Sequence, residues 1–510
     1  MTRRVGPESG EGETTLTGSD ADAAVRASPL LWAALGALLL VRLISLALVP
    51  VADSSEARYA DIGRRMLELD DWITPWFDDG VPFWGKPPLY AWMSAAGMGI
   101  FGIDGFGARL PHFLAGVLVA LVLWDWQRRE RGAAQAQLAV ALLWAAALFY
   151  VCAGAVLTDM ALLLGLVLAM RGFWRALHAP PAERRPEGWL LFVGLAIGLL
   201  AKGPVALVLA GVPITVWLIA TREVSRTWLA LPWLSGTLTM LAIAVPWYLL
   251  AERRTPGFLD YFLIGEHWRR FTVPGWEGDR YGTAHLEPRG MIWVFLLLAC
   301  MPWPLLLPLL AWGRRTHLRP ASARPAGPST REGLYLWAWA LWPCILFTAS
   351  RNILWTYVLP SLPALAILGA AWLARDDRPR RHARLVALGL LITAALFAGA
   401  MTMRAVEGKA KSAGELIAAF EAQRQAGDEL FFVGRHQFSV AFYGRGRYRP
   451  LPDFEALAAR LDEAAAAGTG CPRRFVALRR WGDAQPPPAL RARMRHVAVH
   501  EGYELLEVVC

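Results

Sequence analysis

Charged residues, lysine and cysteine are all scarce in this chain of 510 residues. Only 18% of the residues are charged, 55% are hydrophobic, and the mean hydropathy is +0.35. Because soluble domains carry about 25% charged residues, this balance argues against an ordinary soluble enzyme and against a disordered chain. The five cysteines are too few for a disulfide scaffold.

Lysine is rare even among the basic residues. Only Lys86, Lys202, Lys409 and Lys411 occur among 52 basic residues, so the other 48 are arginines, as the codon bias of a GC-rich genome favours. The net charge of +10 does not indicate a nucleic-acid partner, because the arginines are scattered in short loops and form no basic face. We therefore predict no nucleic-acid binding.

Long apolar runs are what the chain has in abundance. A membrane-spanning helix needs about 20 mostly apolar residues. Eleven runs qualify: 29–51, 108–126, 136–153, 160–178, 188–201, 203–220, 228–250, 290–311, 333–349, 355–373 and 384–403. A further run, 89–102, is short, and either spans the membrane or lies at its interface. The predicted fold class is an all-α polytopic membrane protein with about 11–13 transmembrane helices over residues 29–403.

The charges of the loops predict the orientation in the membrane. Residues 1–28 are polar and predict a disordered cytoplasmic tail rather than a cleaved signal peptide. The loops that would then be cytoplasmic are short and arginine-rich: 127–135, 179–187, 221–227, 312–332 and 374–383. The first outer loop, 52–107, carries four basic residues against nine acids. This asymmetry follows the positive-inside rule and places loop 52–107 on the outer side of the membrane.

The last segment, 404–510, predicts a separate small periplasmic α/β domain. Short strands are expected at Leu430–Val433, Phe475–Leu478 and His496–Val499, with helices at Gly414–Gln425 and Phe454–Ala467 between them. The segment contains no phosphate loop or metal-spaced Cys/His cluster. A structural or substrate-guiding role is expected.

Polar residues from five separate outer loops gather at one membrane face in this topology. They are Asp53, Glu56, Arg58, Tyr59, Lys86, Asp159, Lys202, Glu266, His267, Arg270 and Tyr357. Each has a purely structural alternative: Asp159 as a helix cap, Lys202 as a snorkelling side chain, Arg58 as a surface pair, His267 as an interfacial residue. Together they indicate a cavity or a reaction site, because charged groups at membrane depth are costly.

These residue types suit transfer of a group from a lipid-linked phosphate. Lys and Arg hold a phosphate as a point charge and as a bidentate fork. A carboxylate deprotonates an incoming hydroxyl as a general base, and cations stabilise the phosphate as it leaves. We expect one displacement with inversion, with Asp53 or Glu56 as the base and Asp159 as the second candidate. Lys86, Lys202 and Arg270 would hold the phosphate.

At these residues the chain resembles the GT-C integral-membrane glycosyltransferases, and within them the lipid A aminoarabinose transferase-like group related to protein O-mannosyltransferases. The matching stretches run in family order over roughly residues 30–370: Asp53–Ala60, Asp71–Ile73, Gly85–Leu89, Ala108–Pro111, Leu157–Met160, Ala201–Pro204, Pro246–Tyr248, Glu266–His267, Arg270–Phe271 and Thr356–Pro360. Each is weak alone, and together they are specific.

The resemblance implies a GT-C fold with an outer-face active site. It implies a polyprenyl-phosphate donor, such as an undecaprenyl-phosphate monosaccharide, and an envelope acceptor such as lipid A. By the same resemblance the first-loop acid falls in the Asp53/Glu56 stretch, and Asp159 matches the second acid. The remaining outer-face residues match substrate contacts: Arg58, Tyr59, Lys86, Lys202, Glu266, His267, Arg270 and Tyr357.

The chain departs from the family pattern at two places. Ser55-Glu56 stands where the family often reads Asp-Glu, and Gly85 replaces a glutamate before Lys86. In the family that glutamate and a histidine matching His267 can hold a divalent metal. Gly85 supplies no carboxylate, so the resemblance does not carry the metal site over and the sequence leaves the cofactor open.

Two alternatives stay open on the sequence. A protein O-mannosyltransferase shares the fold and the donor but glycosylates Ser or Thr. A membrane transporter or lipid flippase also has many spans and buried charges, but should show internal repeats with interrupted helices in both halves. The sequence shows no such repeat.

Overall fold

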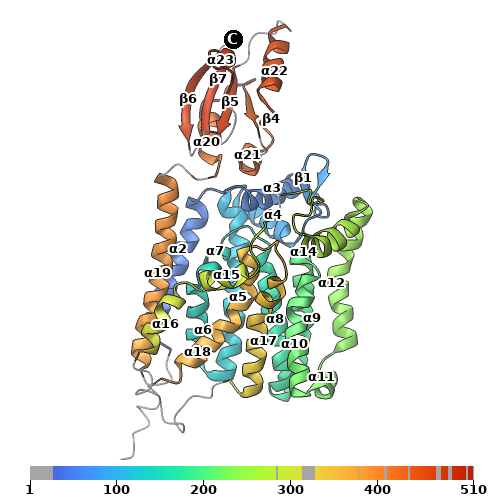
Figure 1. Ribbon diagram of the computed structural model, residues 1–510, viewed down its shortest axis with the longest axis vertical. Helices are drawn as coiled ribbons and strands as arrows, with labels where there is room; N and C mark the ends of the chain where they lie inside the picture. The colour runs from blue at the N-terminus through green and yellow to red at the C-terminus, as the bar shows by residue number, and fades with distance from the viewer. Residues whose placement is uncertain are drawn as a thin grey trace, which may run out of the picture.

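The computed structural model describes residues 27–282, 285–312, 328–376, 378–406, 411–434, 437–466, 473–479, 485–500 and 503–508. The predicted tail, except residues 27 and 28, and most of the predicted loop 312–332 lie outside these residues. The described chain forms a helical bundle with a small sheet above one end (Figure 1).

All eleven apolar runs predicted as spans are helical. They form α2 (Pro29–Leu48), α5 (Gly105–Arg131), α6 (Ala133–Ala145) with α7 (Ala147–Cys152), α8 (Asp159–His178), α9 (Pro181–Lys202), α10 (Val205–Thr221), α12 (Trp233–Arg254), α15 (Met291–Ala299) with α16 (Trp303–Ala311), α17 (Thr330–Thr348), η4 (Trp355–Ser361) with α18 (Leu362–Leu373), and α19 (Pro379–Val406). The short helix α11 (Val224–Ala230) links α10 to α12.

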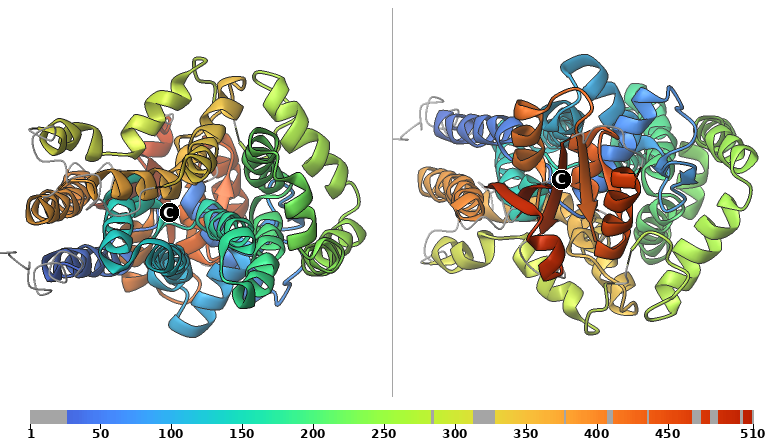
Figure 2. Two further views of the ribbon diagram at one scale, coloured as in Figure 1. Left: turned by 90° about the horizontal axis from the view of Figure 1, so that it is seen from below. Right: turned by 90° about the horizontal axis from the view of Figure 1, so that it is seen from above.

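The chain is a multi-pass membrane protein. Within the described residues six helices are long and apolar enough to cross a membrane, or seven if the bent pair α15–α16 is one span. The first and last of them, α2 and α19, lie side by side in both views of Figure 2 although they are far apart in sequence. The run 89–102 forms α4 (Leu89–Phe101), whose 13 residues are shorter than a span needs.

Two predicted spans are not continuous helices. The run 136–153 breaks at Ala146, whose backbone is extended, and the next amide, that of Ala147, donates to the carbonyl of Met301 instead of continuing the helix. The run 290–311 bends by 68° between its two halves, beside Pro302, which has no N–H for a helical hydrogen bond. The two runs are therefore helical as predicted, but each is interrupted rather than one continuous helix.

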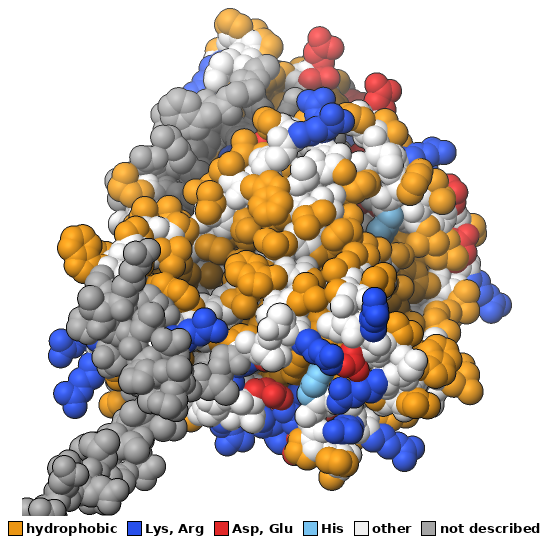
Figure 3. All heavy atoms as spheres, turned by 60° about the horizontal axis from the view of Figure 1, so that its bottom comes forward, with side chains coloured by type: hydrophobic (Ala, Val, Ile, Leu, Met, Phe, Trp, Pro, Cys, Tyr) orange, Lys and Arg blue, Asp and Glu red, His pale blue; other side chains and the backbone are white. Residues whose placement is uncertain are grey.

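The two ends of the bundle differ in charge, as the loops predict. Arginines of the α5–α6, α8–α9 and α10–α12 connections lie at the end where α11 is drawn. Figure 3 views this end and shows basic side chains gathered around it, bordering the apolar flank of the bundle. The opposite end carries α3 (Ser55–Glu68), the hairpin β1 (Trp76–Asp78) and β2 (Val81–Pro82), α4, α13 (Phe258–Asp260), the π-helical η1 (Tyr261–Arg269) and α14 (Arg270–Thr272).

The C-terminal segment forms a five-stranded sheet in the order β4-β3-β5-β7-β6. Its elements are α20 (Gly414–Gln423), β3 (Glu429–Val433), α21 (Phe438–Gly444), β4 (Arg449–Leu451), α22 (Phe454–Ala466), β5 (Arg474–Arg479), α23 (Pro488–Arg491), β6 (Met494–His500) and β7 (Tyr503–Val508). Side chains alternate across the sheet, so that Leu430 packs with α20 and Phe431 with α22. The predicted α/β fold is confirmed, and β4 and β7 are additional strands.

Candidate active site

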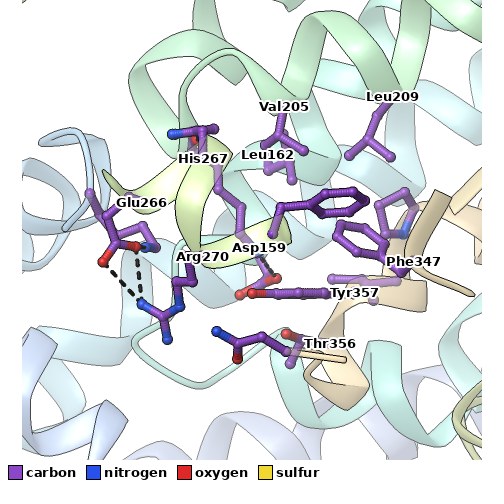
Figure 4. A pocket seen from close by; sticks show the side chains of 16 residues that line it. Asp159, Leu162, Val205, Leu209, Glu266, His267, Arg270, Phe347, Thr356 and Tyr357 are labelled. Carbon is purple, nitrogen blue, oxygen red and sulfur yellow. Dashed lines mark hydrogen bonds and ion pairs between the residues drawn. The ribbon is translucent and has the colours of Figure 1, made fainter. Parts of the chain in front are cut away.

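A cavity opens at the end of the bundle opposite α11, which the predicted topology makes the outer end, and five separate segments meet there. It measures about 110 Å³ and is lined by Lys86, Asp159, Leu162, Lys202, Val205, Leu209, Glu266, His267, Arg270, Phe271, Phe347, Asn352, Thr356, Tyr357, Leu359 and Pro360. Figure 4 shows the charged side chains on one side and Leu162, Val205, Leu209 and Phe347 on the other. The cavity is therefore amphipathic.

Asp159 and Lys202 form the first ion pair of the cavity. Asp159 begins α8 and Lys202 ends the antiparallel helix α9. The two helices can pack closely because Gly165 has no side chain. A Cβ added there would lie only 2.5 Å from the carbonyl oxygen of Gly194. Nζ of Lys202 donates to Oδ1 of Asp159 at 2.6 Å, and the ammonium lies 4.8 Å from the centre of the Tyr357 ring.

Glu266 forms the second ionic group with two cations. Its Oε2 accepts from Nζ of Lys86 at 2.9 Å, and both of its oxygens accept from Nη1 of Arg270 at 3.0 Å. Arg270 also lies 3.3 Å from Asp279. Burial favours the neutral carboxyl, but Lys86 and Arg270 outweigh it and lower the pKa of Glu266. Glu266 is therefore ionised and holds both cations beside the cavity.

The ring of His267 connects η1 to the turn between α9 and α10 through contacts with the backbone of both segments. Its Nδ1 lies 2.8 Å from the carbonyl oxygen of Phe262 and its Nε2 lies 3.3 Å from that of Lys202. Burial lowers the pKa of His267. The turn itself needs Gly203, because its φ is +82° and a Cβ there would lie 2.6 Å from the Phe262 ring.

The residues at this place do not fit a divalent metal. Both nitrogens of His267 face backbone carbonyls, and both oxygens of Glu266 are bonded to cations. Gly85 has no ligand atom, and a side chain there would meet the Phe83 ring at 2.9 Å. In the described part of the chain no three His, Cys, Asp or Glu residues are grouped as metal ligands.

The two first-loop carboxylates do not line the cavity. Asp53 accepts hydrogen bonds from the backbone N–H of Ser439 at 3.0 Å and from its hydroxyl. Glu56 receives a bidentate pair from Arg109, with Nε and Nη2 both at 2.7 Å. Burial opposes ionisation of Glu56, but Arg109 outweighs it and lowers the pKa of Glu56. Asp53 thus docks the C-terminal segment, and Glu56 ties α3 to α5.

Arg58 and Tyr59 lie beside the cavity in an aromatic cluster rather than on its wall. The guanidinium of Arg58 lies 5.1 Å from the Tyr59 ring, 5.7 Å from the Phe83 ring and 5.6 Å from the Phe438 ring. It also donates to the carbonyl of Tyr281. These contacts link the first loop to the C-terminal segment.

Sequence reasoning missed Asn352 and Thr356 on the cavity wall. Asn352 is 8% exposed, and its Oδ1 accepts from the backbone N–H of His285 at 3.1 Å. The neighbouring Arg351 is exposed instead. A buried asparagine next to an exposed arginine gives no sequence signal, so only the structure could select it.

The cavity can hold an amphipathic anion. Three cations, Lys86, Lys202 and Arg270, line it against two carboxylates, Asp159 and Glu266, which leaves one positive charge in excess when His267 is neutral. Arg and Lys near a dry apolar wall bind phosphate well. A phosphate would lie at the cations and an apolar chain along the aliphatic wall.

The chain is similar to known sugar transferases. Residues 30–262 match the family of dolichyl-phosphate-mannose-protein mannosyltransferases. The undecaprenyl phosphate-alpha-4-amino-4-deoxy-L-arabinose arabinosyl transferase of Edwardsiella ictaluri is 32% identical over 324 residues, covering 63% of this chain and 55% of that protein. The protein of the same name from Pseudomonas paraeruginosa is 32% identical over 378 residues, which cover 70% of this chain and 64% of that protein. The chain thus spans 55–64% of the length of these two relatives.

The fold matches that of a solved structure. The crystal structure of ArnT from Cupriavidus metallidurans bound to undecaprenyl phosphate superposes with a TM-score of 0.72 and 21% identity, covering 94% of this chain and 98% of that one. Its apo form gives a TM-score of 0.70. The predicted GT-C fold is confirmed.

Proposed function

We propose that this chain belongs to the GT-C membrane glycosyltransferases of the aminoarabinose transferase-like group and transfers a monosaccharide from a polyprenyl-phosphate carrier to an envelope acceptor, as its similarity to such proteins supports. The donor class is an undecaprenyl-phosphate sugar, and lipid A is the favoured acceptor. The reaction takes place at the periplasmic face of the bacterial inner membrane, at the end of the bundle opposite the arginine-rich connections.

One observation carries this proposal: Lys86, Lys202, Arg270 and Asp159 line one amphipathic cavity at the outer end of the bundle. A lipid-linked sugar phosphate has the same division, with an anionic head and an apolar chain. The cations bind the phosphate, and the aliphatic wall receives the first part of the chain.

Asp159 is the favoured general base, because it is the carboxylate on the cavity wall that has a single cationic partner. It takes the proton from the acceptor hydroxyl as the oxygen attacks the anomeric carbon. The bond between that carbon and the phosphate oxygen breaks, and the electron pair leaves with the lipid phosphate. Lys86, Lys202 and Arg270 stabilise the charge that develops there. One displacement inverts the configuration.

Mass spectrometry of lipid A and of envelope glycoproteins from a deletion strain tests the proposal. Loss of a single sugar from lipid A, restored by the wild-type gene, is expected. Loss from Ser or Thr of envelope proteins would assign the protein-mannosyltransferase activity that the match over residues 30–262 suggests. Unchanged glycans together with a lipid retained in one leaflet would overturn the enzyme assignment in favour of a transporter.

A further inference from the structure

A second cavity with a positive charge lies at the inner end of the bundle. It measures about 360 Å³ and is lined by Ala176, Leu177, Arg184, Arg226, Leu229 and Ala230. These residues come from the end of α8, the first turns of α9 and the connecting helix α11. Because α8 begins at Asp159 and ends at His178, the length of a span separates this cavity from the outer one.

Both arginines of this inner cavity are anchored to the backbone. Nε of Arg184 donates to the carbonyl oxygen of Ala179 at 2.7 Å, and Nη2 of Arg226 donates to that of Leu177 at 2.7 Å. The two carbonyls belong to the C-terminal end of α8, where cations also complement the helix dipole. The guanidinium groups are thus held at the cavity, and each keeps N–H groups that these two bonds do not use.

Two of the three carboxylates near the inner cavity, Glu183 and Glu187, pair with arginines that do not line it. Glu183 pairs with Arg175 and Arg129, and Glu187 pairs with Arg171 and Arg175. Glu223 pairs with Arg331 and lies 3.6 Å from Arg226. Within the described ranges no carboxylate lies within 4 Å of Arg184, and none lines the cavity. The wall of the cavity therefore carries two arginines and no carboxylate, and Glu223, which pairs with Arg226, lies outside the wall.

The rim of the inner cavity is strongly apolar. Leu229 on the wall is 87% exposed, and its neighbour Trp228 is 66% exposed. A tryptophan and a leucine exposed next to arginines are typical of a segment at the membrane interface. Figure 3 shows this end of the molecule with basic side chains beside the apolar flank.

We propose that the inner cavity binds the phosphate of an anionic phospholipid from the cytoplasmic leaflet. Arg184 and Arg226 hold the phosphodiester, and Trp228 and Leu229 contact the upper part of the acyl chains. Basic pockets between helices on the cytoplasmic side recognise such head groups. The inference rests on the charges and the cavity of this end and does not depend on the sugar transfer proposed for the other end.

Native mass spectrometry of the full-length protein in detergent tests this site. The probes are phosphatidylglycerol and phosphatidylcholine with the same acyl chains. The wild type is expected to retain phosphatidylglycerol preferentially, and the pair Arg184→Gln and Arg226→Gln is expected to bind it at least about tenfold more weakly, as the loss of two charge-assisted contacts predicts. The matched control is Arg185→Gln with Arg222→Gln, two exposed arginines of the same end that do not line the cavity.

An equal loss in both double variants, or no loss in either, would overturn the proposal, because binding would then follow total charge or not involve this cavity. Displacement of the lipid by inorganic phosphate at the concentration at which the lipid binds would also overturn it, in favour of a free anion. If the glutamine pair does not fold, Arg184→Lys with Arg226→Lys keeps the charge and removes the guanidinium fork, and an intermediate loss is expected.

Discussion

The ammonium of Lys202 lies 2.6 Å from Oδ1 of Asp159 at the outer end of the bundle. In the proposed mechanism, a donor phosphate that enters the cavity would compete with Asp159 for this ammonium. Donor binding would then free the carboxylate to accept a proton and would place a cation on the leaving group. This exchange links donor binding to the activation of the acceptor.

Replacing Lys202 tests this exchange. Lys202→Met is expected to weaken donor binding by about tenfold or more, because a charge-assisted contact to phosphate is lost. Lys202→Arg should also lose turnover, since the larger fork cannot take the ammonium's position over the Tyr357 ring. Lys411→Met, which changes an exposed lysine outside the cavity, is the control. Unchanged donor binding in Lys202→Met would contradict the proposed role.

The charge of Glu266 predicts a dependence of stability on pH. Its pKa lies below the ordinary value of 4.5, so the ionised form stabilises the folded protein above that pH, and this contribution is lost as the pH falls through the lowered pKa. The midpoint temperature of thermal unfolding should be higher for the wild type than for Glu266→Gln at pH 7. This difference in midpoint temperature should shrink below about pH 4.5. A difference that stays constant over this range would contradict the ionised cluster. Glu277→Gln, an exposed site nearby, is the control.

Asp53 and Ser439 are expected to act on docking rather than on chemistry. Ser439→Ala and Asp53→Asn each remove a hydrogen bond to a charged group, worth about 1.5–3 kcal/mol. Both variants should release the C-terminal segment faster under limited proteolysis. The fraction of each variant that stays folded should transfer the sugar at the wild-type rate. If Asp53→Asn abolishes turnover and Ser439→Ala has no effect, Asp53 is the base instead of Asp159.

The Glu56–Arg109 pair is expected to be essential for stability. Arg109 is 3% exposed and also donates to the carbonyls of Leu46 and Pro50. Glu56→Gln leaves a buried guanidinium without its counter-charge and should cost about 3–5 kcal/mol of folding free energy. Breaking the exposed Arg460–Glu463 pair with Glu463→Gln should cost less than about 1 kcal/mol. Equal effects in thermal unfolding would contradict this ranking.

The spans could be predicted from the sequence because each depends on a local apolar run. The break at Ala146 could not, since alanine favours helix and the break depends on a bond between Ala147 and Met301. In the site, Asp159 and Lys202 lie in short turns at the ends of apolar runs, so the loops alone bring them to one face. The partners of the first-loop acids give no such signal: Asp53 and Ser439 are 386 residues apart, and Glu56 and Arg109 are 53 apart.

The most direct test of the central claim is turnover of an undecaprenyl-phosphate monosaccharide by purified Asp159→Asn, measured together with donor binding. We predict that the variant binds the donor and transfers at least about a hundredfold more slowly than the wild type, as expected for loss of a general base. Asp104→Asn, which preserves the cap of α5 away from the cavity, should transfer normally. Transfer by Asp159→Asn at the wild-type rate would contradict the proposed mechanism.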